Sequence, residues 1–166
     1  MPYSYALGKP EIQAWIYRNF TEGQTCLDVG PGQGTYADLM CGYLTMDACE
    51  IFEPNVKIYG LKEKYRRIAV CDIADFKYEW YDLVIFGDVI EHMTVEKAQE
   101  VLAYARAHSK DQLIAVPWKL PQGAVDGNEY ERHIQDDLTE EIFGERYEGY
   151  EPIWVNHLYG YYHRKL

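Results

Sequence analysis

The stretch Cys26-Leu-Asp-Val-Gly-Pro-Gly-Gln-Gly34 is the most informative in the chain. Residues 25–29 form a short apolar run, and glycines at alternate positions follow it, which permits a tight turn. Apolar residues then recur at helical spacing at Tyr36, Leu39 and Met40. The stretch therefore predicts a strand, a glycine-rich turn and a helix.

The same alternation continues on both sides of this stretch. The spacing of apolar residues predicts a helix over residues 10–20, and a second helix that Thr94 caps, with a buried stripe from Val95 to Ala105. Four further short apolar runs predict strands, at residues 48–52, 67–71, 81–86 and 112–116. Such continuous apolar strands are typical of a parallel sheet that is covered on both faces.

The C-terminal end has a different pattern. Residues 150–155 and 158–164 are too close together for a crossover helix, so we expect an antiparallel pair. The predicted fold class is α/β, a doubly wound, mostly parallel sheet with a C-terminal antiparallel strand pair. We divide this single domain into an N-terminal segment and helix, a core, an insertion, and a last helix with the strand pair: residues 1–22, 23–117, 118–137 and 138–166.

Length and charge limit the function. The chain has 166 residues, about one domain, and a formal net charge of −11, which argues against nonspecific binding to nucleic acid or to anionic membranes. Without a run of 18 apolar residues or a signal-peptide pattern, we expect a cytoplasmic protein. The four cysteines lack paired spacing and are interpreted as reduced core residues, with catalytic thiols as the alternative.

The glycine spacing allows several ligands. A dinucleotide-binding turn has Gly or Ala at its sixth position, but that position here is Thr35, which weakens the interpretation as a nucleotide-dependent oxidoreductase. A phosphate-binding Walker loop is excluded, because no Gly-Lys-Ser/Thr follows. A turn without any ligand remains an alternative.

Residues 26–34 closely resemble the first motif of class I S-adenosylmethionine-dependent methyltransferases, in which a strand ends in an acid and Gly-x-Gly-x-Gly follows. Three later segments resemble further motifs of that family in the same order: Cys49–Asn55, Val70–Phe76 and Tyr81–Met93. The resemblance covers more than half of the chain. It implies a Rossmann-like fold, S-adenosylmethionine as the methyl donor and S-adenosylhomocysteine as the product.

The resemblance also implies which residues bind the donor. Glu53, with Pro54, takes the position of the acid that accepts from the ribose hydroxyls, and Asp47 and Glu50 are the alternatives. Asp72 and the amide of Ile73 take the adenine positions, and Gly87 and Asp88 the methionine end. The glycine turn contributes Asp28, Gly30, Pro31, Gly32 and Gly34.

The acceptor side is expected outside these motifs. In the family it is shaped by the N-terminal segment, which here carries Tyr3 and Tyr5, and by the insertion, which carries Trp118 and Tyr130. His133 is the first candidate for a base or hydrogen-bonding group on the acceptor, and His92 is the second. We expect no metal, although Asp88, Glu91 and His92 at i, i+3 and i+4 on a helix form an alternative cation site.

The acidic residues are concentrated in one region. Residues 126–151 contain ten acids and two arginines, so this segment carries −8 of the total −11. The resemblance implies a methyltransferase, for which we expect a small-molecule acceptor, and the local acidity makes a cationic acceptor the first guess. The alternative is a noncatalytic module of the same fold that binds S-adenosylmethionine or S-adenosylhomocysteine. The acceptor atom and the oligomeric state stay open.

Overall fold

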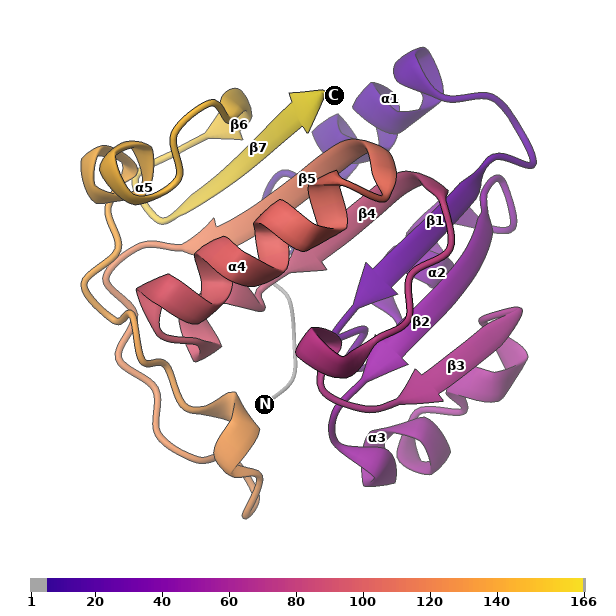
Figure 1. Ribbon diagram of the computed structural model, residues 1–166, viewed down its shortest axis with the longest axis horizontal. Helices are drawn as coiled ribbons and strands as arrows, with labels where there is room; N and C mark the ends of the chain where they lie inside the picture. Colours follow the sequence, from indigo (N-terminus) through magenta and orange to yellow (C-terminus); the bar gives the residue numbers. More distant parts are fainter. Residues whose placement is uncertain (1–5, 166) are drawn as a thin grey trace.

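The computed structural model describes residues 6–165, and within this range seven strands form one sheet in the order β3-β2-β1-β4-β5-β7-β6 (Figure 1). The strands that pair in parallel are β1 (Thr25–Val29), β2 (Thr45–Glu50), β3 (Arg67–Val70), β4 (Tyr81–Gly87) and β5 (Ser109–Pro117). The antiparallel strands at one edge are β6 (Glu151–Val155) and β7 (Tyr159–Lys165). The predicted α/β sheet with a C-terminal antiparallel pair is confirmed.

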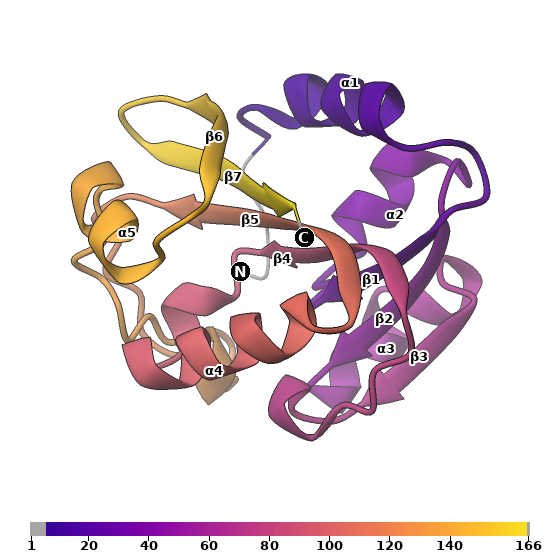
Figure 2. The same ribbon diagram turned by 45° about the horizontal axis from the view of Figure 1, so that its top comes forward.

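Helices cover both faces of the sheet (Figure 2). One face packs against α1 (Lys9–Asn19), α2 (Thr35–Met40) and α3 (Glu53–Ile58), and the other against α4 (Val95–Arg106) and α5 (Glu140–Arg146). Four short 3-10 turns lie between them, namely η1 (Leu61–Glu63), η2 (Ile73–Asp75), η3 (Ile90–His92) and η4 (Glu129–Glu131). Thr94 caps α4 as predicted, because its hydroxyl accepts from the Lys97 amide at 3.3 Å.

Alternate strand residues build two separate cores. In β4, Leu83 and Ile85 point to the core under α1 and α2, and Val84 and Phe86 point to the core under α4. This follows from the period of two in a strand, and all four side chains are fully buried. Because both faces of β4 are buried, its sequence contains a continuous apolar run.

The predicted bounds of β2 are wrong. The strand spans Thr45–Glu50 instead of 48–52, because Asp47 lies inside it and is buried. Arg66, Arg67 and Tyr81 all donate hydrogen bonds to the Asp47 carboxylate, at 2.6–3.2 Å. Although burial alone would raise it, these bonds lower the pKa of Asp47 to about 2. These three donors thus stabilise a charged residue inside β2, where the apolar pattern of the sequence did not predict a strand.

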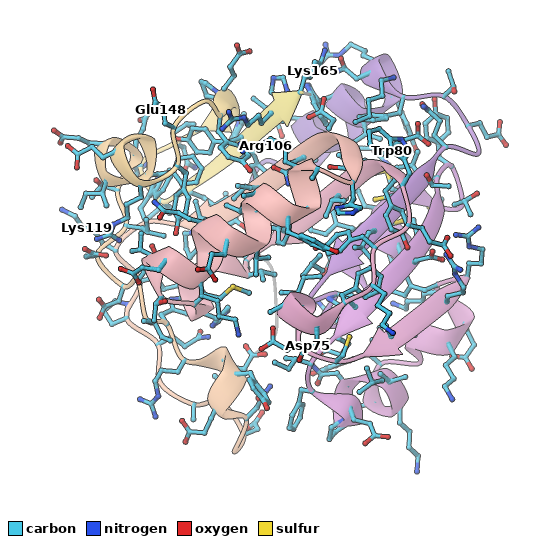
Figure 3. All side chains as sticks on the ribbon, in the orientation of Figure 1. Asp75, Trp80, Arg106, Lys119, Glu148 and Lys165 are labelled. Carbon is cyan, nitrogen blue, oxygen red and sulfur yellow. The ribbon has the colours of Figure 1, made fainter. Side chains whose placement is uncertain are left out.

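The surface shows one further difference from expectation. Cys26 and Cys49 are buried and Cys71 is half-buried, but Cys41 is exposed, so the interpretation of all four as core residues is wrong for Cys41. Trp80, before β4, is 54% exposed, and Glu148 lies at the outer edge of the molecule beyond α5 (Figure 3). No helix in the described part of the chain is long and apolar enough to cross a membrane.

Candidate functional site

A cavity of about 430 Å³ opens at the carboxyl ends of the parallel strands. It lies where β1 pairs with β2 on one side and with β4 on the other, so that the chain winds in opposite directions from this point. Ligand sites of doubly wound sheets occur at this topological switch point. Its walls come from the ends of β1, β2, β4 and β5, from the residues that follow β3, from η3 and from the insertion. The lining residues include Gly30, Pro31, Gly32, Glu50, Asn55, Asp72, Ile73, Gly87, Asp88, Glu91, His92, Lys97, Gln122, Asn128, Tyr130, Glu131 and His133.

The glycine-rich turn forms the floor of one end. Gly30, Gly32 and Gly34 all have positive φ angles, of 62°, 53° and 84°. A β-carbon on Gly30 would lie 2.9 Å from Cγ2 of Val89, so a side chain there is opposed both by the backbone angle and by space. The turn therefore brings the main chain of residues 30–32 to the cavity surface. Gly34 does not line the cavity and is the N-cap residue of α2.

Asp28 lies beneath this turn and does not line the cavity. It is 1% exposed, and the Tyr65 hydroxyl donates to its Oδ2 at 2.6 Å. Burial raises the pKa of Asp28 to about 7, although Tyr65 and Lys9 oppose the shift. The acid at the first motif is thus a buried side chain that is bonded to Tyr65 and separate from the cavity lining.

The acid that faces the cavity from β2 is Glu50. Its Oε1 accepts from the Phe52 amide at 2.8 Å, and its Oε2 accepts from the Asn55 side chain at 3.4 Å. Burial raises the pKa of Glu50. Glu53 and Pro54, by contrast, are exposed at the start of α3 and do not line the cavity. Glu50 therefore takes the place in the cavity that we expected for Glu53.

Asp72 and Ile73 lie at the cavity edge as expected. Asp72 Oδ1 accepts from the Ala74 amide at 3.0 Å and so caps η2, and its Oδ2 pairs with Lys97 Nζ at 2.6 Å. These partners outweigh burial and lower the pKa of Asp72, which is ionised at neutral pH. Lys97 had no distinguishing signal in the sequence, because only the fold brings α4 beside the end of β3.

The exit of β4 is closely packed. A β-carbon on Gly87 would lie 2.3 Å from Cε2 of Tyr36, so only glycine fits beside that ring. Asp88 follows with a φ of 57°, a left-handed conformation that is uncommon for any residue but glycine, and its Oδ1 accepts from the Tyr159 hydroxyl. Asp88 thus precedes η3 and does not share a helical face with Glu91 and His92, so the alternative cation site based on that face does not form as expected.

The insertion is fastened to η3 by hydrogen bonds. The amides of Ile134 and Gln135 both donate to the Glu91 carbonyl, at 2.8 and 3.0 Å. The buried Gln135 side chain donates to the carbonyls of Ile90 and Met93, at 2.8 and 3.1 Å. These contacts place His133 opposite η3.

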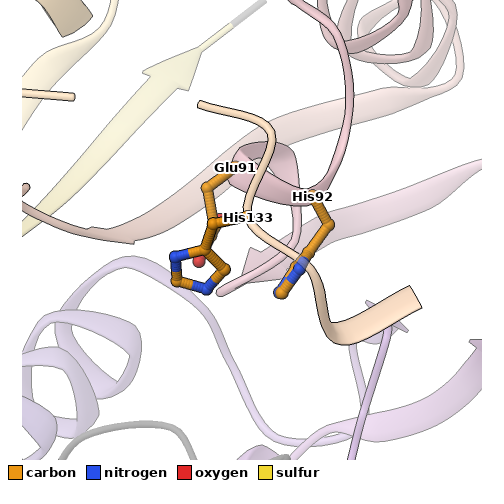
Figure 4. A group of neighbouring side chains, drawn as sticks. All are labelled: Glu91, His92 and His133. Carbon is orange, nitrogen blue, oxygen red and sulfur yellow. The ribbon is translucent and has the colours of Figure 1, made fainter. Parts of the chain in front are cut away.

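His92 and His133 meet at this end of the cavity, with ring centroids 4.7 Å apart (Figure 4). Burial and the neighbouring His133 lower the pKa of His92 to about 4, although the carbonyls of Arg132 and Asp88 oppose this. Burial also lowers the pKa of His133. Both imidazoles are therefore neutral at pH 7 and able to accept a proton or to act as ligands.

The remaining acceptor-side candidates separate into three groups. Tyr130 lines the cavity and is 54% exposed. Trp118 does not line it: its indole donates to the Asn156 carbonyl at 3.0 Å and packs near Phe143, which is an anchoring role. Tyr3 and Tyr5 lie outside the described residues.

Little of the acidic segment faces the cavity. Of the ten acids in residues 126–151, only Glu129 and Glu131 line it. Glu129 pairs with Arg132 at 2.8 Å, which leaves Glu131 as the acid without an opposing arginine there. The local charge of −8 is thus mostly exposed surface.

Comparisons with known proteins give structural matches only. No family model matches the chain, and no curated protein matches its sequence. A S-adenosylmethionine-dependent methyltransferase from Clostridium acetobutylicum ATCC 824 has a TM-score of 0.74 at 14% identity, covering 99% of this chain and 92% of its own. The 1,6-didemethyltoxoflavin-N1-methyltransferase of Burkholderia thailandensis, solved with its substrate and S-adenosylhomocysteine, has a TM-score of 0.68 at 16% identity, covering 96% and 78%.

Magnesium protoporphyrin IX methyltransferase from Synechocystis PCC 6803, with bound S-adenosylhomocysteine, has a TM-score of 0.65 at 16% identity and covers 93% of this chain and 80% of its own. At these identities the likeness concerns the fold. The chain has the Rossmann-like fold of the class I S-adenosylmethionine-dependent methyltransferases, as its four ordered motifs predict.

Proposed function

We propose that this protein transfers a methyl group from S-adenosylmethionine to a small-molecule acceptor. The observation that carries the proposal is a single cavity that joins the glycine turn, Glu50 and Asp72 to a second wall made by η3 and the insertion. Its volume of about 430 Å³ lies within the range of small-molecule sites, roughly 300–1,000 Å³. Three structures of two neighbouring proteins with bound donor or product have the same fold, which supports S-adenosylmethionine as the cofactor.

The donor roles follow the lining of the cavity. We assign the ribose hydroxyls to Glu50, because a carboxylate accepts from both hydroxyls of a diol and Glu53 does not line the cavity. Asp72 and the Ile73 amide would hold the adenine, since a carboxylate oxygen that pairs with Lys97 still has a lone pair for an amino group. The backbone of residues 30–32, with Gly87 and Asp88, would surround the methionine end.

The chemistry requires positioning more than acid or base groups. Methyl transfer is an in-line displacement, and holding the nucleophile about 3–3.5 Å from the methyl carbon supplies much of the rate. His92, His133 and Tyr130 would contact the acceptor on the opposite wall. Either neutral histidine is able to accept a proton if the acceptor loses one during attack. For a cationic acceptor, the insertion offers Glu131, because Glu129 is paired with Arg132.

Calorimetric titration with S-adenosylhomocysteine tests the donor site. Glu50→Gln should weaken binding about 10- to 100-fold, about 1.4–3 kcal/mol, because the ribose hydroxyls lose a charged acceptor. Glu53→Gln is the matched control and should bind as the wild type does. An equal loss in both variants, or a loss only in Glu53→Gln, would contradict the assignment to Glu50.

Two further measurements separate the alternatives. A titration with NAD should give no binding, and a preference for NAD over S-adenosylhomocysteine would refute the methyltransferase. Incubation with S-adenosylmethionine and pools of small-molecule acceptors should yield products heavier by one methyl group, read by mass spectrometry. Donor binding with no methylated product in any pool would favour the noncatalytic module.

A further inference from the structure

Three side chains of the kind that bind metals meet at the acceptor end of the cavity. Glu91 and His92 come from η3, and His133 comes from the insertion (Figure 4). One ligand atom from each lies within 4.8 Å of the others. His133 is about 40 positions from Glu91 and His92 in the sequence, so only the docking of the insertion on η3 brings it to them.

Each imidazole is oriented by a backbone carbonyl. His92 Nδ1 lies 3.1 Å from the Arg132 oxygen, and His133 Nδ1 lies 2.6 Å from the Leu120 oxygen. A histidine that binds a metal commonly donates its other ring N–H to such a carbonyl, which fixes the tautomer and the ring orientation. With the proton on Nδ1, the Nε2 atom of each ring keeps its lone pair for a ligand.

Glu91 is the least satisfied acid at the site. Its side chain is 1% exposed, and neither carboxylate oxygen has a hydrogen-bond partner among residues 6–165. Burying an unpaired carboxylate is costly, so a buried acid in a folded protein takes up a proton, is paired or coordinates a metal. A cation held between this carboxylate and two neutral imidazoles would satisfy it.

We propose that Glu91, His92 and His133 bind one divalent transition-metal ion. Two imidazole nitrogens and one carboxylate oxygen suit Zn²⁺ or Co²⁺ better than Mg²⁺, which prefers oxygen ligands throughout. Bonds of about 2.0–2.2 Å require the ligand atoms to lie roughly 3–4 Å apart, so the three side chains close by about an ångström around the ion. Asp88 is not in this set, because it precedes η3 and its carboxylate accepts from Tyr159.

Three protein ligands leave at least one coordination position open toward the cavity, as in catalytic zinc sites. We assign that position to a hydroxyl oxygen of the acceptor, an assignment that rests on the proposed function. Coordination lowers the pKa of the hydroxyl, and its proton leaves to solvent. The oxygen then forms a bond to the methyl carbon while the carbon–sulfur bond breaks, and the electron pair of that bond returns to sulfur to give the neutral thioether.

Metal titration of the full chain tests the site. Tag-free protein is treated with EDTA, dialysed, and titrated with ZnCl₂, CoCl₂ or MgCl₂ by calorimetry. We expect one Zn²⁺ or Co²⁺ ion per chain, visible absorption bands from bound Co²⁺, and binding of Mg²⁺ weaker by about 100-fold or more. Binding of Mg²⁺ as tight as that of Zn²⁺ would overturn the assignment of a transition metal.

Variants locate the ion. His133→Ala and Glu91→Gln should each weaken Zn²⁺ binding by at least about 10-fold and alter the Co²⁺ spectrum, with circular dichroism reporting that both variants fold. His157→Ala is the control, because this exposed histidine lies between β6 and β7 and outside the cavity. A wild type that binds none of the three ions, or variants that bind as the wild type does, would overturn the proposal.

Parallel titrations with S-adenosylhomocysteine separate this inference from the proposed function. Donor binding without metal binding overturns the metal site and leaves the methyltransferase supported. Metal binding without donor binding supports the site and overturns the methyltransferase.

Discussion

The two walls of the cavity are constructed in different ways. The donor wall is made from strand ends and tight turns, and its acids Glu50 and Asp72 are fixed by neighbouring amides at 2.8 and 3.0 Å. The acceptor wall is made mainly from residues 120–134, whose regular structure is the single turn η4 and an isolated bridge between Val125 and Asn128. Its position depends on the hydrogen bonds to η3 that surround Gln135.

Because of this difference, we expect specificity to change in the acceptor wall rather than in the donor wall. Strand ends are held by the sheet, so a donor site built on them keeps its geometry while the loops vary. A wall made from an insertion tolerates changes in length and composition without disturbing the sheet. Substitutions in the donor wall should therefore affect donor affinity and stability together, whereas substitutions in the acceptor wall should leave donor affinity intact.

The largest expected effect is at the glycine turn. Gly30→Ala places a β-carbon 2.9 Å from Val89 at a φ of 62°, so the turn must move. We expect affinity for S-adenosylhomocysteine to fall by about 100-fold or more, because strain of roughly 1–3 kcal/mol adds to the lost fit. Calorimetry measures this. Gly123→Ala, in open space on the insertion, is the control and should bind normally. Equal affinities of the two variants for S-adenosylhomocysteine would show that donor binding is no more sensitive to the donor wall than to the acceptor wall.

The next effect concerns Asp28, the buried acid of β1 that precedes the glycine turn. Because the pKa of Asp28 is about 7 in the folded protein and 3.8 for an unperturbed aspartate, the folded state holds this proton to higher pH. The free energy of unfolding should therefore fall as pH rises from about 4 to about 7, by up to about 3 kcal/mol between pH 5 and pH 8. Asp28→Asn has no titratable carboxyl group at this position, so it lacks this contribution to the pH dependence of the free energy of unfolding.

Urea unfolding of wild type and Asp28→Asn at both pH values isolates the contribution. The variant should gain stability relative to the wild type at pH 8 and lose most of that gain at pH 5. A difference between the two proteins that is the same at both pH values would show that Asp28 is ionised throughout this range.

The smallest expected effect is on the acceptor wall. Gln135→Ala removes the donors to the Ile90 and Met93 carbonyls, which should cost about 1–3 kcal/mol of stability. Hydrogen exchange of residues 120–134 should accelerate, and affinity for S-adenosylhomocysteine should stay within about twofold of the wild type. Gln99→Ala, an exposed change on α4, is the control. A large loss of donor affinity in Gln135→Ala would show that the two walls are coupled.

Glu53 and Glu50 illustrate why the site was only partly predictable. The expected strand followed apolar residues to Phe52, so the acid after it was Glu53. The strand in fact begins at Thr45, because Asp47 inside it is buried among Arg66, Arg67 and Tyr81. It ends at Glu50, which pairs with Val70 at the end of β3. A charge that is neutralised by residues on other strands has no signature in a local pattern. Asp72 and Ile73 do line the cavity, because β3 ends near its predicted position.

The sequence by itself determined the order of strands and helices, the glycine turn and the antiparallel end, because these depend on local spacing and on backbone conformations that few residues adopt. Which polar side chains share the cavity, by contrast, depends on the tertiary structure. Glu91, His92 and His133 meet there, and Trp118 and Glu53 do not, because contacts across the sheet and between loops place each side chain. Such contacts join residues far apart in the chain, and local periodicity carries no information about them.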